Sequence, residues 1–482
     1  MSALNFAPAA PALLKSCVEQ AGFTAKTVDF SQLFYTEISN RNFELYNTDS
    51  SYLLPRHPRH TDSENKVKQW LDLCIAHIKH ENPKFVGLSI FTYYMIRSAY
   101  LLCHEIRKCC PDVKIILGGY GLTQSANNLK NIPGLKNIDL VKNFDVFCTE
   151  RNLSDYNIIG EGEEALVRIL ESDQTVKHQV DPVVLYNVPT SNFDNYNLVD
   201  YCYASDRIIL PVTGSKGCVR QCTFCDIPQK FGKFRYRSGK HIADEIVFLK
   251  EKYGVKNFTF TDSLINGSLK ALTELVSSLA EHNDACAAED RIRWSAQYIS
   301  RPRGQTPEHV YELMARSGAE GLTIGLESGS NSVLEAMNKK VKIEDVDYEL
   351  EIFEKYGISV ALLFIIGFYN ETYDDFVDTI QTIIRYQKYV ASGTVLKMDL
   401  GMPLIITSET ALYLDAHNLG IELNSTDPAK WKVAANPDLT LIERVRRRVI
   451  AQLVCDQLGI PTGMSGYNIK RMADLLDNES TF

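Results

Sequence analysis

The chain has 482 residues, of which 45% are hydrophobic and 23% charged, and its formal net charge is −9. These proportions are those of a globular protein and exclude intrinsic disorder. The net charge argues against a general nucleic-acid binder, and no run approaches the roughly 20 apolar residues that span a membrane. The N-terminus lacks the basic start and apolar run of a secretory signal, so a cytoplasmic protein without membrane or nucleic-acid partners is expected.

Strand and helix signals alternate over the first 170 residues. Strand-like runs lie at 25–30, 84–91, 113–121 and 156–159, and helical patterns at 12–22, 97–111 and 162–170. This alternation predicts a parallel, doubly wound α/β sheet in residues 1–170. Such sheets bind ligands at the carboxyl ends of their strands, where Gly118, Gly119, Gly160 and Gly162 lie.

A polar, weakly periodic linker is predicted at 171–206, and a second alternation begins at 207. Its strands are predicted at 207–213, 257–262, 292–299, 321–330, 358–367 and 393–402, with helices between them. Six β/α units are fewer than the eight of a closed barrel, so a partial, open (β/α)6 barrel is expected over 207–410. One of its helices opens at Thr372, with Asp375 placed for a capping box.

A helical extension is predicted at 411–482. It contains the one basic run of the chain, Arg444 with 446–448, which alternates with Val and Ile. This pattern is typical of a solvated helix face.

Nine of the twelve cysteines are scattered and predict reduced core residues. The other three, Cys218, Cys222 and Cys225, form a C-x3-C-x2-C array directly after a predicted strand. Thiolates suit zinc or an iron–sulfur cluster, but structural zinc takes four ligands. The nearest histidine, His241, lies sixteen residues after Cys225, and no second C-x2-C occurs. A [4Fe–4S] cluster on three thiolates would leave one iron open to a substrate or cofactor.

This array, with Phe224 before its last cysteine, resembles the signature of the radical S-adenosylmethionine (SAM) superfamily. Three further stretches resemble that family in order: "FTDS" at 260–263, "IGLESGSNSVLEAMNKK" at 324–340 and "LFIIGFYNET" at 363–372. The last follows the family pattern G-x-I-x-G-x-x-x-E, with Leu363 in place of the first glycine. The resemblance covers about 207–410.

The resemblance implies that Cys218, Cys222 and Cys225 ligate a [4Fe–4S] cluster whose fourth iron binds S-adenosyl-L-methionine. Reduction would cleave SAM to methionine and a 5′-deoxyadenosyl radical, with the difficult chemistry carried by the cofactor. An electron donor such as flavodoxin or ferredoxin is implied. No catalytic residue beyond the cluster ligands is assigned. The implied SAM contacts are Glu327 and Ser328 for the ribose, Ile365 and Gly367 for adenine, and Asp262, Ser263 and Gln297 for the methionine moiety or the substrate.

"PKFVGLSIFTYY", "IILGGYG" and "IIGEGEEAL" resemble, in order, the cobalamin-binding domain that precedes many radical SAM barrels. The resemblance implies a flavodoxin-like domain. The cobalamin contacts that it implies are Ser89, Gly118, Gly119, Gly160 and Glu161. Two features depart from this pattern. No D-x-H-x-x-G occurs in residues 1–170, so no histidine of this region is placed below the cobalt, and "MSALNFAPAAP" hardly supplies the usual opening strand. Either the start is truncated or the domain has become a scaffold.

The leading hypothesis is a radical SAM enzyme that methylates or rearranges an unactivated carbon, with or without cobalamin. One alternative is a radical SAM oxidoreductase whose N-terminal domain is a scaffold, and another is an iron–sulfur or zinc protein without catalysis. For the glycines of the N-terminal domain, the alternative is that they only allow tight turns. For Glu327, the alternative is a carboxylate stabilised by the dipole at a helix N-terminus. The methylthiotransferase branch is disfavoured because its second set of cluster cysteines is not matched by the N-terminal cysteines, which lie mostly in helical patterns: Cys17, Cys74, Cys103, Cys109, Cys110 and Cys148.

Overall fold

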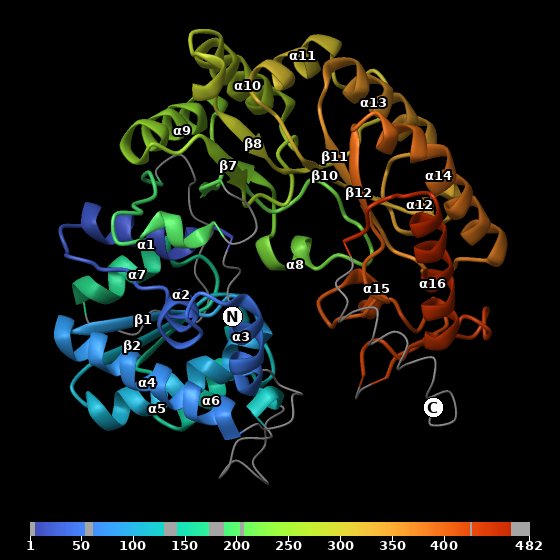
Figure 1. Cartoon of the computed structure of the whole chain (residues 1–482). Helices are drawn as coiled ribbons and strands as arrows, with labels where there is room; N and C mark the ends of the chain where they lie inside the picture. The colour runs from blue at the N-terminus through green and yellow to red at the C-terminus, as the bar shows by residue number, and fades with distance from the viewer. Residues whose placement is uncertain are drawn as a thin grey trace. The chain divides into compact units, whose positions relative to one another are not determined.

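The structure, a computed structural model, describes residues 5–53, 61–129, 142–172, 188–202, 207–424 and 427–463. The chain forms two compact units, Met1–Pro211 and Val212–Phe482 (Figure 1). No helix in the described ranges is both long enough and apolar enough to cross a bilayer.

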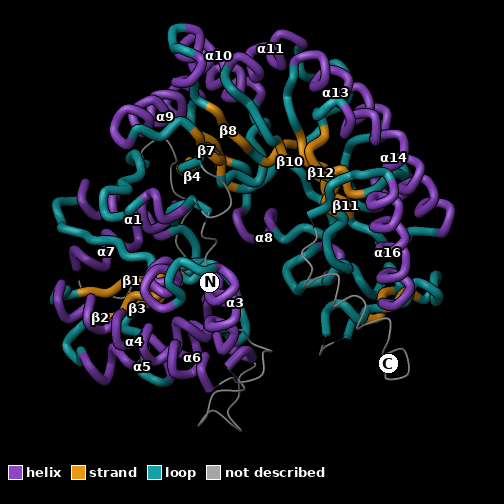
Figure 2. Tube along the Cα trace, viewed as in Figure 1, coloured by secondary structure: helices purple, strands orange, loops and turns teal. Residues whose placement is uncertain are grey.

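The first unit is built on a parallel sheet of order β1-β2-β3. Its strands are β1 (Phe85–Ser89), β2 (Lys114–Gly118) and β3 (Tyr156–Ile158). Its helices are α1 (Ala9–Gln20), α2 (Phe30–Leu33), α3 (Phe43–Asp49), α4 (Thr61–Glu81), α5 (Ile96–Cys109), α6 (Phe144–Glu150) and α7 (Gly162–Ser172) (Figure 2).

Successive residues of β2 face opposite sides of this sheet, as a strand requires. Ile115 and Leu117 pack in a core that includes residues of α4 and α5, whereas Ile116 packs with Ala165 and Ile169 of α7. Helices therefore cover both faces of the sheet. Five of the nine scattered cysteines are buried on helices, as predicted for core residues: Cys17, Cys74, Cys103, Cys148 and Cys455. The other four are partly exposed: Cys109, Cys110, Cys202 and Cys286.

The predicted strand at 25–30 is wrong. Residues 23–29 are irregular, and Phe30 begins α2. The backbone groups there bond to side chains instead of to another strand: Thr27 N donates to Asn195 Oδ1, and Asp29 Oδ1 accepts from the first turn of α2. Aspartate is a strong helix N-cap, and this local preference outweighs the short apolar pattern.

The second unit has parallel strands in two sheets, ordered β4-β7-β8 and β9-β10-β11-β12. The strands are β4 (Ile209–Val212), at the junction of the units, β7 (Asn257–Phe260), β8 (Arg293–Ser295), β9 (Gln297–Tyr298), β10 (Leu322–Glu327), β11 (Val360–Phe364) and β12 (Val395–Asp399). The helices of the barrel are α8 (Ile227–Phe231), α9 (Gly239–Tyr253), α10 (Leu269–Asp284), α11 (Glu308–Arg316), α12 (Asn331–Ala336), α13 (Ile343–Tyr356) and α14 (Tyr373–Ala391).

The single strand predicted at 292–299 is divided at Ala296. Its first half, β8, pairs with β7, and its second half, β9, pairs with β10. This change of partner joins the two sheets into one curved wall with six strand positions, covered outside by helices (Figure 2). The predicted capping box of α14 is confirmed, since Thr372 and Asp375 bond each other's backbone amides.

After the barrel come α15 (Ala411–Leu414), a hairpin of β13 (Ile421–Glu422) and β14 (Lys432–Val433), and α16 (Leu441–Gln457), which packs on α14. The prediction of a solvated basic face on α16 is wrong for three of its four arginines. Arg444, Arg447 and Arg448 are buried, and Arg446 is exposed. The buried three bond to carbonyl and carboxylate oxygens of neighbouring segments, which supply the partners that solvent would otherwise provide.

Candidate metal centre and cofactor site

The three-cysteine loop follows β4 and the short strand β5 (Ser215–Lys216), and it ends where α8 begins. Gly217, at φ +83°, turns the chain into the loop. Thr223 N donates to Met337 O, and Asn338 Nδ2 donates to Gln221 O. The loop is thereby fixed to the segment that follows α12, which belongs to the stretch at 324–340 singled out in the sequence.

The three thiols lie close enough to influence one another. Burial raises the pKa of Cys222, and it raises the pKa of Cys225 to about 11; the charge of Cys218 adds to both pKa shifts. Cys218 Sγ accepts a hydrogen bond from the backbone amide of Arg220 at 3.3 Å. A bound metal ion compensates the charge of thiolates, so three neighbouring cysteines are a donor set that fits an iron–sulfur cluster.

Within the described ranges, no three His, Cys, Asp or Glu side chains already stand in a metal-holding arrangement. The assignment of the loop therefore rests on the spacing of its three cysteines in the sequence and on the chemistry of thiolate donors. Two cations lie beside them, Arg220 and Lys339, and the fields of both act on Cys222. Nearby cations favour the thiolate form that binds metal.

Glu327, at the end of β10, is paired with Lys339. Lys339 Nζ donates to Glu327 Oε1 at 2.8 Å, both side chains are largely buried, and the ammonium lies 5.8 Å from the ring centre of Phe224 in the cysteine loop. Glu327 has φ +72°, in the left-handed region, and a bulge between Gly325 and Glu327 interrupts the pairing with β11. Strained non-glycine backbone of this kind clusters at functional sites.

Gly325 makes room for this pair. A Cβ at that position would overlap Glu327 Oε1 and lie 2.8 Å from Lys339 Nζ. Gly325, the first glycine in "IGLESG", is therefore explained by a side-chain pair and not by its own backbone conformation. The sequence reasoning missed Lys339, although it lies within the quoted stretch at 324–340; its partner is evident only from the fold.

The other predicted SAM residues at the ends of β10 and β11 lie near one another. Ile365 N donates to Glu327 O at 2.8 Å, which joins the two strand ends. Gly367 has φ +79°, and its amide donates to both carboxylate oxygens of Glu371 at 3.0 Å. Ser328 is fully buried and its hydroxyl lies 3.2 Å from Thr379 Oγ1 on α14, so its side chain is bonded within the fold.

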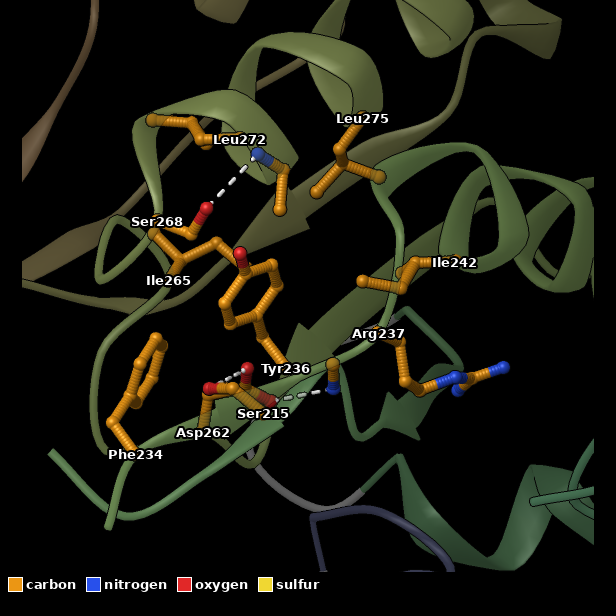
Figure 3. Close-up of a pocket in the computed structure, with 12 residues that line it drawn as sticks. Ser215, Phe234, Tyr236, Arg237, Ile242, Asp262, Ile265, Ser268, Leu272 and Leu275 are labelled. Carbon is orange, nitrogen blue, oxygen red and sulfur yellow. Dashed lines mark hydrogen bonds between the residues drawn. The ribbon is translucent and has the colours of Figure 1, made fainter. Parts of the chain in front are cut away.

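Asp262, at the end of β7, is bonded to the entry of the cysteine loop (Figure 3). Its carboxylate accepts from Gly214 N at 2.8 Å and from Ser215 Oγ at 2.6 Å, and burial raises its pKa to about 7. These residues line a cavity of about 10 Å³, which is room for roughly one water molecule. Asp262 thus fixes the backbone at the start of the cysteine loop through its hydrogen bonds to Gly214 and Ser215. Ser263 follows it and is partly exposed, and the side chain of Gln297 is exposed.

In the first unit, the predicted cobalamin residues lie at the carboxyl edge of the sheet. Ser89 and Gly118 are paired at the ends of β1 and β2, and Gly160 and Glu161 lie between β3 and α7. Gly119 has φ +97°, and a Cβ there would lie 2.6 Å from Ile90 O. A tight turn against β1 by itself accounts for glycine at 119.

Comparison with known proteins agrees with this geometry. Residues 212–383 match the family model described as the radical SAM superfamily. The chain is 33% identical over 181 residues to a bacteriochlorophyllide d C-12(1)-methyltransferase of Chlorobaculum tepidum, a match over 37% of this chain and 38% of that enzyme. The matched part is thus well under half of that relative's length.

Two solved structures share the fold. One is the radical SAM methyltransferase TsrM from Kitasatospora setae with cobalamin and a [4Fe–4S] cluster bound, with a TM-score of 0.61 and 16% identity, covering 87% of this chain and 78% of that one. The other is the cobalamin-dependent radical SAM enzyme OxsB, with a TM-score of 0.57 and 16% identity, covering 86% of this chain and 65% of that one. These two structures show the fold alone, and the family match with the cysteine loop at the carboxyl end of the barrel leads to one conclusion: residues 212–383 of this chain form a radical SAM domain.

Proposed function

We propose that the protein is a radical SAM enzyme that reductively cleaves SAM at a [4Fe–4S] cluster to modify an unactivated carbon. The observation that carries this proposal is the meeting of the three-cysteine loop with the strained Glu327–Lys339 pair. Loop and pair come from β/α units far apart in the sequence, and both lie at the carboxyl ends of strands, where barrel enzymes place their chemistry.

Each residue has a role in this proposal. Cys218, Cys222 and Cys225 would hold the cluster, which would supply the reducing electron for cleavage of SAM. Lys339 and Arg220 offset the negative charge of the thiolates. Asp262 keeps the entry of the loop in place through Gly214 and Ser215.

The remaining residues at the strand ends position SAM and the substrate. Glu327 accepts hydrogen bonds from the ribose hydroxyls. Ser328, buried and bonded to Thr379, holds the backbone that follows Glu327. The backbone at Ile365 and Gly367 borders the adenine. Ser263, which is partly exposed, and Gln297, which is exposed, contact the methionine moiety or the substrate.

The reaction class that we propose is methylation or rearrangement. Bacteriochlorophyllide d C-12(1)-methyltransferase and a cytidylyl-2-hydroxyethylphosphonate methyltransferase of Streptomyces wedmorensis are among the relatives, and both names describe methyl transfer. We propose that the electron comes from a small protein donor such as flavodoxin or ferredoxin and that the reaction takes place in the cytoplasm.

We include cobalamin in the proposal, bound at the carboxyl edge of the β1-β2-β3 sheet by Ser89, Gly118, Gly119, Gly160 and Glu161. The support is an apolar surface at that edge: Phe91 and Tyr94, directly after β1, are 72% and 56% exposed. Two large exposed aromatic side chains suit a flat ring. The tight turn at Gly119 accounts for that glycine without a ligand, and the alternative is a scaffold unit in a radical SAM oxidoreductase.

Anaerobic reconstitution with iron and sulfide tests the proposal. The protein is then reduced with dithionite in the presence of SAM, and products are separated by chromatography. We expect 5′-deoxyadenosine, and S-adenosylhomocysteine as well if methyl transfer occurs with hydroxocobalamin added. Metal bound without either product would leave the non-catalytic iron–sulfur or zinc protein, and zinc and iron are told apart by elemental analysis.

A further inference from the structure

We propose that α16 is a positioning element for SAM: Arg447 holds Glu371, and Glu371 holds the backbone turn at Gly367. This inference rests on the proposed function, because it takes that turn to border the adenine of SAM. It assigns a role to a helix outside the matched family region, which ends at residue 383.

The turn after β11 depends on a single carboxylate. Gly367 N donates to both oxygens of Glu371 at 3.0 Å, and the Glu371 side chain is only 1% exposed. With φ +79°, residue 367 has a conformation that glycine adopts at little cost. The direction of the turn is therefore set by where the Glu371 carboxylate is held.

Arg447 holds that carboxylate from a position 76 residues away in the sequence. Its Nη1 donates to Glu371 Oε1 at 3.0 Å and to Thr372 O at 3.0 Å, at the N-terminus of α14. Its Nε donates to Glu443 Oε1 at 3.1 Å, one helical turn back on α16. The guanidinium thus has carboxylates on two sides, which fixes its orientation as well as its position.

A second arginine of α16 closes the other side of the turn. A Cβ at Gly367 would overlap Arg444 Cγ and lie 3.0 Å from Arg444 Cβ and Cδ. Arg444 is itself fully buried: its guanidinium carbon lies 3.6 Å from the ring centre of Trp431, and Nη2 donates to Ala429 O at 2.8 Å. Gly367 is therefore enclosed by α16, with Glu371 on its amide and Arg444 against its α-carbon.

A merely structural ion pair would have a different effect from a positioning pair. Buried ion pairs are weak evidence for stability, because desolvation of both charges offsets their attraction. If the pair acts only on stability, its loss lowers the melting temperature and leaves ligand affinity unchanged. If it positions the turn, its loss weakens binding of every ligand that carries the adenosine group and spares the cluster, which is held elsewhere by the three cysteines.

The test uses the reconstituted full chain and the variants Arg447→Met and Glu371→Gln. The matched control is Arg446→Met, since Arg446 lies on the same helix but is exposed. Affinities for SAM and for 5′-deoxyadenosine are measured by calorimetry, together with iron content and melting temperature. We expect both variants to bind both ligands roughly tenfold to a hundredfold more weakly, the effect of losing one charged hydrogen bond, with unchanged iron. Arg447→Lys should restore part of the affinity.

The outcomes separate this inference from the proposed function. A wild-type protein that binds no SAM contradicts the proposed function. If the wild type binds SAM, either variant that retains full iron content and wild-type affinity overturns the role of α16. Glu371→Gln decides the matter should Arg447→Met fail to fold, because glutamine keeps the volume of the side chain.

Discussion

Lys339 Nζ donates a hydrogen bond of 2.8 Å to Oε1 of Glu327, which lies twelve residues earlier in the chain. The backbone of Glu327 is in the left-handed region, where a non-glycine residue is strained. The pair brings a carboxylate to the end of β10 and an ammonium to the cysteine loop. Four of the five predictions below concern single buried contacts of this kind, because one side-chain change then alters one contact.

Gly325→Ala should displace the Glu327–Lys339 pair without unfolding the barrel. The added Cβ overlaps the far ends of two flexible side chains, which can move, and not backbone. We expect weaker SAM binding with unchanged iron content. Gly87→Ala is the control, since a Cβ at 87 has no atom within 4 Å. Calorimetry with SAM checks the prediction, and unchanged affinity in Gly325→Ala would contradict it.

Glu327→Gln should weaken SAM binding by about 1.5–3 kcal/mol, the value of a charged hydrogen bond to the ribose. Glutamine still accepts a hydrogen bond from Lys339, so the fold should persist. Glu335→Gln, at an exposed position on the nearby α12, serves as control. If both variants bind SAM equally well, Glu327 has no contact with the ligand and serves only as the partner of Lys339.

Cys222→Ala should lose the cluster while the protein stays folded. Cys222 is the most buried of the three loop cysteines, and two thiolates alone do not hold a [4Fe–4S] cluster. Cys286→Ala, at a partly exposed cysteine on another segment, should keep the wild-type iron content and charge-transfer absorption. Equal iron in the two variants would overturn the ligand assignment.

Stability should fall as pH rises because of Glu349 on α13. This carboxyl is buried, its Oε1 accepts from Tyr298 and Tyr311 at 2.9 and 2.7 Å, and burial raises its pKa from an ordinary 4.5 to about 7. A raised pKa means that the folded state holds the proton more tightly. The contribution of protonated Glu349 to the free energy of unfolding is complete below about pH 4.5. It is lost as pH rises through 7, which lowers the free energy of unfolding by about 3 kcal/mol.

Glu349→Gln should therefore reduce the dependence of melting temperature on pH between 5 and 8, and the remaining slope is expected from Asp262, whose pKa burial also raises to about 7. Glutamine keeps an acceptor for the two tyrosine hydroxyls but does not ionise. Glu351→Gln, two residues further on the same helix and exposed, should leave the wild-type slope. A wild-type slope in Glu349→Gln would show that the carboxyl stays ionised in the folded protein.

Bound cobalamin should have no protein nitrogen below its cobalt, because the first unit, to which we assign the cobalamin, contains no D-x-H-x-x-G; the pattern occurs only at 415–420, in the second unit. Electron paramagnetic resonance of the cobalt(II) form should then lack the superhyperfine splitting that an imidazole ligand produces. Splitting that persists when dimethylbenzimidazole is excluded by isotopic labelling would refute this. If folded protein with a full cluster fails to bind hydroxocobalamin, the first unit is a scaffold.

Features that depend on neighbours in the sequence were predictable. The capping box of Thr372 and Asp375 involves residues three apart, and strand and helix periods repeat within a few residues. The spacing of Cys218, Cys222 and Cys225 belongs to the same class, because one loop carries all three ligands. Local bonding also explains the wrong strand at 25–30, where the capping preference of Asp29 outweighed a short apolar run.

The sequence by itself thus determined the strand–helix alternation, the cysteine loop and the stretches that accompany it. Only the tertiary structure decided that the barrel strand changes partner at Ala296, that Lys339 pairs with Glu327, and that the arginines of α16 are buried. An arginine next to Val and Ile has the same local pattern whether water or a distant carboxylate solvates it. Glu371 is 76 residues from Arg447, and folding brings them together because burial of either charge alone would be far more costly than burial of the pair.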